Sequence, residues 1–314
     1  MCAWKVLLTD GLEENGQAIL REKAEVDNCP TISAEELLQV VANYDAVIVR
    51  GRTKMVPAVF DAASRLKVVG RAGVGVDNIN LEAAKAHGVT VVNSPTATTE
   101  AVAELTLGLM LASVREIGRA DATMKQNQWL KKQFMGAELF GKTLGVIGFG
   151  RIGATVAKMA ASAFEMKILA YDPLLTAEQI AARGGTPVTL DDLYKAADFI
   201  TLHVPLTADT RNTLNAEAFA KMKDGVRIVC AARGGVIDEA ALLDALNSGK
   251  VASAALDVFS AEPPGESPLV AHPKVICTPH VGAQTEEAQA RAADDIAHEV
   301  LAALEGQPLR WKVA

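Results

Sequence analysis

Short runs of apolar residues recur along the chain, and segments with helical periodicity separate them. Within the runs nearly every residue is apolar, a pattern typical of strands buried on both faces of a parallel sheet. We predict strands at Val6–Thr9, Ala46–Val49, Lys67–Val69, Val89–Val92, Leu144–Ile147, Ile168–Tyr171, Phe199–Leu202, Ile228–Ala231, Ala254–Leu256 and Val275–Cys277.

Helical patterns fall between these runs, at Ala34–Val41, Arg151–Ala163, Leu190–Ala197 and Glu239–Asn247. Strand–helix–strand alternation predicts an α/β protein with doubly wound parallel sheets and right-handed crossovers. Two longer helical stretches, Thr99–Lys125 and Ala283–Leu304, break the rhythm. We therefore predict one domain at 1–95 and 283–314 and a second at 96–282. The two long helices would connect them, with a cleft between the domains.

Composition narrows the functional classes. A chain of 314 residues is long enough for two cores. Its net charge of −7 argues against general affinity for nucleic acids or anionic membranes. The longest apolar stretch, Leu105–Val114, is far shorter than the roughly 20 residues that span a bilayer. No CxxC pair occurs, which favours a cytoplasmic protein without disulfides or a thiolate metal site; the cysteines are Cys2, Cys29, Cys230 and Cys277.

The most informative motif is the glycine pattern Gly148-x-Gly150-x-x-Gly153, between a predicted strand and a predicted helix. In dinucleotide-binding folds the first glycine permits a tight turn, the second admits the pyrophosphate, and the third lets helix and strand pack closely. The next predicted strand ends at Asp172, where a carboxylate that binds the ribose hydroxyls belongs. Because such a carboxylate repels a 2′-phosphate, we expect NAD rather than NADP.

Three residues with complementary chemistry follow predicted strands of the second domain: Arg233, Glu262 and His280. Ligands of open α/β sheets bind at the carboxyl ends of the strands. Histidine can take a hydroxyl proton near neutral pH, and a carboxylate on its other nitrogen would orient it. Arginine offers a planar fork of donors to a substrate carboxylate. This set predicts oxidation of an alcohol by hydride transfer.

Each of these residues also has an ordinary structural interpretation. His280 follows Pro279 and could simply lead into a helix, Glu262 could be a solvated loop acid, and Arg233 could form a surface ion pair. Their convergence on one predicted sheet edge favours the catalytic interpretation.

The first domain contains a predicted anion site. The segment Gly70–Asn78 places small residues after a strand, and such segments expose backbone N–H groups that can bind a carboxylate. Arg50 ends another strand, Arg52 follows it, and Lys131–Lys132 adds basic charge elsewhere. Basic residues at strand ends of an acidic protein indicate an anionic substrate, although a solvated charged rim is the alternative.

With these motifs in place, the chain resembles the D-isomer-specific 2-hydroxyacid dehydrogenase family over essentially its whole length. The motifs are closest to members that oxidise 3-phospho-D-glycerate, and they are Gly70–Asn78, Gly148–Gly153, Ala232–Asp238, Ala255–Pro264 and Pro279–Ala283. The resemblance implies a Rossmann domain that binds NAD and a flavodoxin-like domain that binds the substrate. It further implies the first step of serine biosynthesis, no metal, and a homodimer joined through the long helix of the nucleotide domain.

The resemblance also assigns residues. Arg233, Glu262 and His280 match the catalytic set, and Arg50, Arg71, Gly73, Gly75 and Lys131 match substrate-binding positions. Lys131 would reach the site of the neighbouring subunit. The cofactor positions are Val74, Gly148, Gly150, Arg151, Ile152, Gly153, Asp172, Val204, Pro205, Ala231, Ala232 and Asp257.

Three positions depart from the family pattern. Lys131 and Val74 replace an arginine and a threonine of some relatives, and Cys230 replaces an asparagine. Two other functions stay open. The first is a different substrate of the same family, such as glyoxylate, hydroxypyruvate or D-lactate. The second is an NAD-sensing binding protein, since corepressors share this fold and the Arg–Glu–His set.

Overall fold

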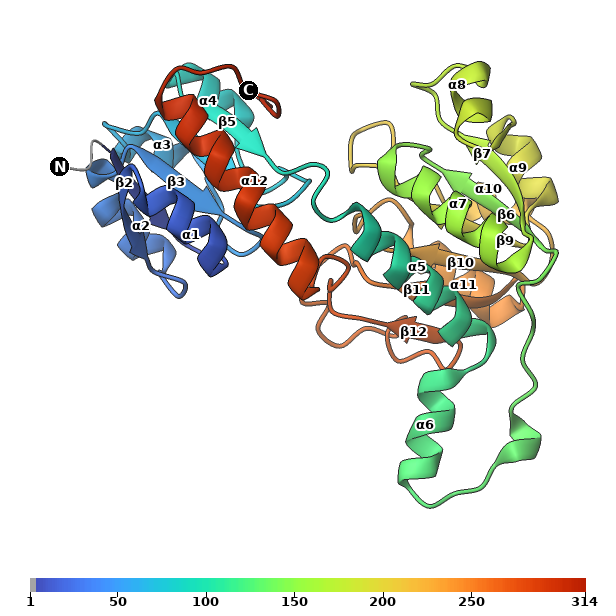
Figure 1. Cartoon of the computed structure of the whole chain (residues 1–314). Coiled ribbons are helices and arrows are strands. Elements are labelled where there is room, and N and C mark those ends of the chain that lie inside the picture. The colour runs from blue at the N-terminus through green and yellow to red at the C-terminus, as the bar shows by residue number, and fades with distance from the viewer. Residues whose placement is uncertain (1–3) are drawn as a thin grey trace. The chain divides into compact units, whose positions relative to one another are not determined.

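The computed structural model describes residues 4–314, which form two compact α/β units (Figure 1). The first unit extends to Thr98 and resumes at Ala283, and the second is Thr99–Gly282. Each unit has its own parallel sheet and its own hydrophobic cores. The fold class predicted from the sequence, two doubly wound parallel sheets, is confirmed.

The first unit has a five-stranded sheet in the order β2 (Ala24–Asn28), β1 (Trp4–Leu8), β3 (Ala46–Val49), β4 (Val68–Arg71) and β5 (Thr90–Asn93). This is the flavodoxin-like order, which reverses direction between β1 and β3. Helices α1 (Glu14–Arg21) and α12 (Glu286–Leu304) cover one face. The other face carries α2 (Ala34–Val40), the 3₁₀ turn Val41–Asn43, α3 (Pro57–Ala62) and α4 (Leu81–Ala86).

The two-sided burial of β3 explains its unbroken apolar sequence. Ala46 and Ile48 belong to the core under α1 and α12, whereas Val47 and Val49 belong to the core on the opposite face. Successive side chains of a strand point to opposite faces, so a central strand covered on both sides needs apolar residues throughout.

The second unit has a seven-stranded sheet in the order β12 (Val275–Cys277), β11 (Val251–Leu256), β10 (Val226–Cys230), β9 (Phe199–Leu202), β6 (Thr143–Ile147), β7 (Lys167–Tyr171) and β8 (Thr186–Pro187). One face packs against α5 (Thr99–Val114), α7 (Arg151–Phe164) and α8 (Ala177–Ala182). The other packs against α9 (Leu190–Ala196), α10 (Ala216–Lys221) and α11 (Glu239–Ser248). The strand order reverses between β6 and β9, where doubly wound sheets bind their ligands.

The prediction of a single helix over Thr99–Lys125 is wrong. The segment forms two helices, α5 and α6 (Ile117–Lys125), and Glu116 between them has a left-handed φ of 49°. The Val114 carbonyl, near the end of α5, accepts the Ala137 N–H at 3.0 Å instead of continuing the helix. Residues 117–140 form an arm that extends from the end of α5 and returns toward β6 (Figure 1). The arm includes the 3₁₀ turn Lys131–Gln133.

Other expected features can be compared with the described residues. Cys29, Cys230 and Cys277 are free thiols, and Cys2 lies outside the described residues. Within residues 4–314, no helix has both the length and the apolar character needed to cross a membrane. The same residues contain no group of three or more metal-ligating side chains arranged to hold an ion.

Candidate active site

Glu262 and His280 come together beyond the carboxyl ends of β11 and β12. The Nδ1 atom of His280 lies 2.7 Å from Oε2 of Glu262. Because an ionised carboxylate only accepts hydrogen bonds, Nδ1 donates and carries the proton. In the neutral ring this leaves Nε2 free of a proton, as a group that receives a proton requires. The two side chains are 48% and 37% exposed, so solvent can reach the pair.

The ionised form of Glu262 is stabilised by its surroundings. Partial burial by itself raises the pKa of this carboxyl group. The hydrogen bonds from His280 and from the Phe259 N–H outweigh that effect, together with the nearby charges of His280 and Arg233, and hold the pKa below its ordinary value. The site therefore keeps a carboxylate beside the imidazole at neutral pH.

Asp257 anchors the loop that carries His280. Its residue is fully buried, and its carboxylate accepts the Thr278 hydroxyl at 2.6 Å and the N–H groups of Val281 and Gly282, both at 2.9 Å. The His280 N–H donates to the Asp257 carbonyl at 2.8 Å. His280 has a left-handed φ of 53°, a conformation that is uncommon for a residue with a side chain.

Arg233 follows β10 and lies beside the same pair. Its Nη1 donates to the Ala232 carbonyl at 2.7 Å, and its own carbonyl accepts a weak hydrogen bond from the Cys230 thiol at 3.9 Å. Burial raises the pKa of Cys230 to about 11, so this thiol stays protonated. The charge of Arg233 contributes to the lowered pKa of Glu262, which places Arg233 in the neighbourhood of the pair. The catalytic roles of the three residues remain predictions.

Each of the three glycines of the Gly148-x-Gly150-x-x-Gly153 motif has a different structural role. Gly148 has φ +87°, and a Cβ there would lie 2.6 Å from the His203 carbonyl oxygen. A Cβ at Gly153 would lie 2.1 Å from the Gly148 oxygen. Gly150, which precedes α7, has open space within 4 Å of its Cβ position. Two glycines are thus required by packing, and the third leaves room at a helix N-terminus, where phosphates bind.

Asp172 lies at the end of β7, next to this loop. Its Oδ2 accepts the Phe149 N–H at 2.8 Å, and its Oδ1 accepts the Leu174 N–H at 2.9 Å. The carboxylate therefore borders the glycine turn, as a ribose-binding acid must. This arrangement and the space at Gly150 fit NAD.

The other predicted cofactor residues of this unit occupy the same edge or its helix. Arg151 and Ile152 begin α7. Val204 and Pro205 follow β9, whereas Ala231 and Ala232 follow β10. Their contacts with a cofactor remain predictions, as does a contact between Asp257 and the nicotinamide.

The predicted anion residues of the first unit lie after β3 and β4. The Arg50 N–H donates to Asp10 at 2.7 Å, and its guanidinium forms no ion pair within residues 4–314. Arg71 donates to the Ala72 carbonyl at 2.6 Å and folds over Gly73, whose φ is +145°. Arg52 has a structural role instead, because it pairs with Asp10 at 3.1 Å and binds the Ile32 carbonyl.

Elsewhere in this segment, the Val74 carbonyl accepts a hydrogen bond from the side-chain Nδ2 of Asn93 at 2.7 Å, and Gly75 follows Val74. Lys131 belongs to the second unit, where it is exposed on the arm. The substrate roles of these residues remain predictions.

Two further residues near the site were not predicted from the sequence. His203 directly follows β9, and its Nε2 lies 3.0 Å from the Thr201 hydroxyl. Burial lowers the pKa of His203 to about 4. Glu239, at the start of α11, accepts the Ser260 N–H at 2.6 Å. Only the position of His203 directly after a strand could have drawn attention to it, and Glu239 has no comparable signal.

Comparisons with known proteins identify the family of this chain. The family model described as D-isomer specific 2-hydroxyacid dehydrogenase, NAD binding domain, matches residues 107–282. D-3-phosphoglycerate dehydrogenases from Synechocystis and Methanocaldococcus jannaschii are 47% and 50% identical over 98% and 96% of this chain. The chain covers 56% and 58% of these two relatives, little more than half of their lengths.

Solved structures match along the whole chain. A protein from Thermus thermophilus aligns with a TM-score of 0.88 at 35% identity, covering 99% of this chain and 100% of its own. A glyoxylate reductase from Paecilomyes thermophila aligns with a TM-score of 0.90 at 31% identity, covering 100% of this chain and 99% of its own. The chain therefore belongs to the D-isomer specific 2-hydroxyacid dehydrogenase family, and its second unit contains the NAD-binding domain of that family.

Proposed function

We propose that this chain catalyses the NAD-dependent oxidation of 3-phospho-D-glycerate to 3-phosphohydroxypyruvate, the first step of serine biosynthesis. The observation that carries the proposal is the hydrogen-bonded pair of Glu262 and His280, with Arg233 beside it, in an NAD-binding domain. The relatives named D-3-phosphoglycerate dehydrogenase support the choice of substrate.

Each residue of the site has a distinct task in this reaction. Arg233 binds the substrate carboxylate and orients the carbon that is oxidised. His280 takes the hydroxyl proton on Nε2 while Nδ1 stays hydrogen-bonded to Glu262, whose negative charge stabilises the imidazolium that forms. When bound, NAD⁺ accepts the hydride from that carbon.

The phosphate group is assigned to the first unit. Arg50 is the best candidate, since its guanidinium forms no ion pair within the described residues. Arg71 is the second, and the backbone around Gly73 and Gly75 supplies N–H groups for an anion. Arginine suits a phosphate because its planar fork can donate two parallel hydrogen bonds.

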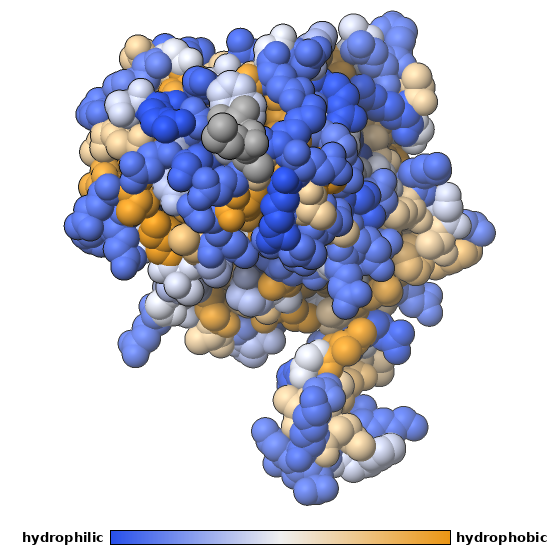
Figure 2. Space-filling model, turned by 60° about the vertical axis from the view of Figure 1, so that its left-hand side comes forward, coloured by the Kyte–Doolittle hydropathy of each residue, from blue (hydrophilic) through white to orange (hydrophobic). Residues whose placement is uncertain are grey.

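The proposal includes a homodimer in the cytoplasm. The arm exposes large apolar side chains that an isolated chain would leave in water: Trp129 is 77% exposed, Met135 90% and Phe140 61%. Figure 2 shows apolar patches on this arm, which projects at the bottom of the view. Exposed apolar patches of this kind favour a protein interface, and Lys131 would reach the partner's site from it. The free thiols fit a reducing compartment.

The experiment that tests the substrate compares NADH formation with 3-phosphoglycerate, glycerate, D-lactate and 2-hydroxyglutarate. We expect the highest kcat/KM with 3-phosphoglycerate. Arg50→Gln should lower that value by about 10-fold or more while changing the rate with glycerate little. Arg21→Gln, an exposed arginine paired with Glu14 in the same unit, is the matched control. Equal rates with unphosphorylated acids would refute the phosphate assignment.

A second candidate is reduction of glyoxylate or hydroxypyruvate, because a glyoxylate reductase is among the similar structures. The same enzyme preparation can be assayed with NADH and either compound. A higher kcat/KM for glyoxylate than for 3-phosphohydroxypyruvate would favour this function and leave the roles of Arg233, Glu262 and His280 unchanged.

A further inference from the structure

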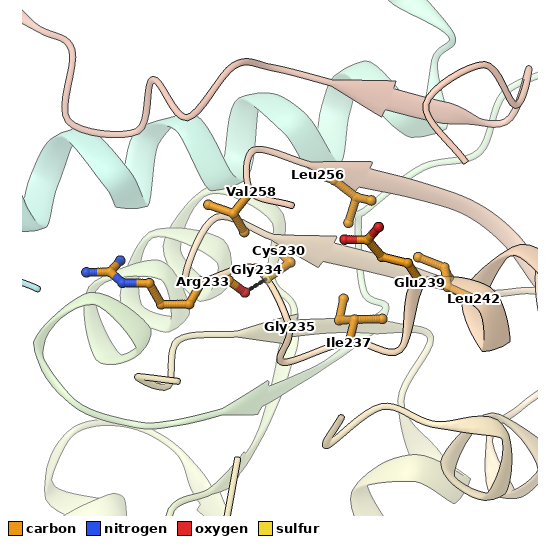
Figure 3. Close-up of a pocket in the computed structure, with 9 residues that line it drawn as sticks. All are labelled: Cys230, Arg233, Gly234, Gly235, Ile237, Glu239, Leu242, Leu256 and Val258. Carbon is orange, nitrogen blue, oxygen red and sulfur yellow. Dashed lines mark hydrogen bonds between the residues drawn. The ribbon is translucent and has the colours of Figure 1, made fainter. Parts of the chain in front are cut away.

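Glu239 lies under the loop that carries Glu262, although the proposed reaction does not use it. It is the first residue of α11, and it lines a small pocket together with Arg233 and Val258 (Figure 3). An acidic residue in the first turn is usually explained by the positive end of the helix dipole. Here Asp238 already caps α11 by accepting the N–H groups of that turn, and the Glu239 carboxylate contacts a different segment.

Two carboxylates hold two consecutive N–H groups of this loop. The Ser260 N–H donates to Oε1 of Glu239 at 2.6 Å, and the Phe259 N–H donates to Oε1 of Glu262 at 3.1 Å. The second oxygen of Glu262 contacts His280 at 2.7 Å. The two N–H groups belong to adjacent peptide units that meet at the Phe259 Cα. A displacement of the backbone there that released the Ser260 N–H would therefore also shift the Phe259 N–H and its hydrogen bond to Glu262.

The loop that carries Phe259 and Ser260 also packs against the segment that follows Arg233. A Cβ at Gly234 would lie 1.8 Å from the Phe259 carbonyl oxygen, so the backbones of the two segments are in direct contact. The Phe259 carbonyl thus packs closely against Gly234, and the following N–H donates to Glu239. Glu239 therefore supplies the hydrogen bond that fixes the turn of the loop, whereas Gly234 fixes its distance from the Arg233 segment.

We propose that Glu239 is a positioning residue: through the Ser260 N–H it holds the loop so that Glu262 faces His280. The inference rests on the proposed function in one respect, since the benefit of this orientation is the proton transfer assigned to His280. Glu239 itself contacts neither of these two residues in any hydrogen bond of the described structure.

The kinetic test uses paired substitutions. Glu239→Ala removes the acceptor and should lower kcat by about 10-fold with little change in KM for NAD. Glu239→Gln keeps an oxygen that can accept the Ser260 N–H and should retain turnover within about 2-fold. Glu217→Ala, an exposed acid in the first turn of α10 in the same unit, is the matched control and should leave kcat unchanged.

A double-mutant cycle separates positioning from a general loss of structure. If Glu239 acts through Glu262, the Glu239→Ala change should cost less than about 2-fold when it is made in a Glu262→Gln enzyme. A full 10-fold cost in both backgrounds would overturn the proposal, as would equal losses in Glu239→Ala and Glu239→Gln.

A spectroscopic readout does not depend on the substrate. The ¹⁵N shifts of His280, assigned by their loss in His280→Gln, report which ring nitrogen carries the proton at alkaline pH. The wild-type chain should show the Nδ1–H form, Glu239→Gln should keep it, and Glu239→Ala should show a mixture of the two forms. An unchanged Nδ1–H form in Glu239→Ala would overturn the inference. The expected NMR result without activity on 3-phosphoglycerate would instead refute the proposed substrate.

Discussion

Asp257 and Gly282 are joined by a 2.9 Å hydrogen bond in which the Gly282 N–H donates to a fully buried carboxylate. A Cβ at Gly282 would lie 3.2 Å from the same oxygen, so only a small residue allows this approach without displacement. With the bonds from Thr278 and Val281, this contact ties the loop around His280 to the end of β11. The geometry of His280 therefore depends on a residue that is itself shielded from solvent.

Asp257→Asn should destabilise the second unit and slow turnover. The amide nitrogen cannot accept a hydrogen bond, so at least one buried donor loses its partner, at a cost of about 2 kcal/mol. Urea unfolding and kcat measure the two effects. Thr278→Val removes only one of the three hydrogen bonds and should cost about 1 kcal/mol. Wild-type stability in Asp257→Asn would contradict the anchoring role.

His280→Ala should lower kcat by about 10²–10⁴-fold and leave the affinity for NAD unchanged, because the imidazole moves a proton. Steady-state kinetics and NADH fluorescence titration measure these two quantities. His298→Ala is the matched control, since His298 is an exposed histidine on α12 paired with Asp294. Near-normal turnover in His280→Ala would exclude proton transfer by this residue.

The sequence predicted the parts of the fold whose signals are local. The apolar runs of β3 and β9 match the structure because both strands are buried on both faces. Strand β2 was missed since Ala24–Asn28 lies at the sheet edge and is mostly polar or partly exposed. The break at Glu116 was missed because it depends on the Val114 carbonyl meeting Ala137, a contact created by the returning arm.

The same distinction applies to the site. The positions of Arg233, Glu262 and His280 after strands of the second unit could be predicted because the apolar runs before them are local signals. Their catalytic roles remain predictions. The contact of Glu239 could not be predicted. Its partner Ser260 is 21 residues away, and the hydrogen bond comes from the backbone N–H, so the type of residue at position 260 gives no sign of it.

Gly150→Ala should weaken NAD binding without destabilising the protein. Its φ of −70° suits alanine, and its Cβ position has no neighbour within 4 Å, so the added methyl group would meet only the bound pyrophosphate. We expect the Kd for NAD, measured by titration, to rise by about 10-fold or more, while the Tm stays unchanged. Gly153→Ala should instead lower the Tm, because its Cβ would lie 2.1 Å from the Gly148 oxygen. A lowered Tm in Gly150→Ala would contradict this division of roles.

His203 should make the stability of the second unit depend on pH. Burial lowers its pKa from 6.5 to about 4 in the folded protein. Between those values the unfolded chain binds more protons than the folded one, so stability rises with pH and is lost as pH falls, by at most about 1.4 kcal/mol per pH unit. The lowered pKa of Glu262 adds a loss in the same direction, but only below its ordinary value of 4.5.

His203→Gln should therefore reduce the slope of unfolding free energy between about pH 6.5 and 5 and leave the slope above pH 7 unchanged. Urea unfolding at several pH values, followed by far-UV circular dichroism, measures the unfolding free energy in both pH ranges. Glutamine can still bond to the Thr201 hydroxyl that contacts Nε2, so the comparison changes the titrating group more than the packing. Parallel curves for wild type and His203→Gln over the whole range would show that His203 takes up its proton without cost to the fold.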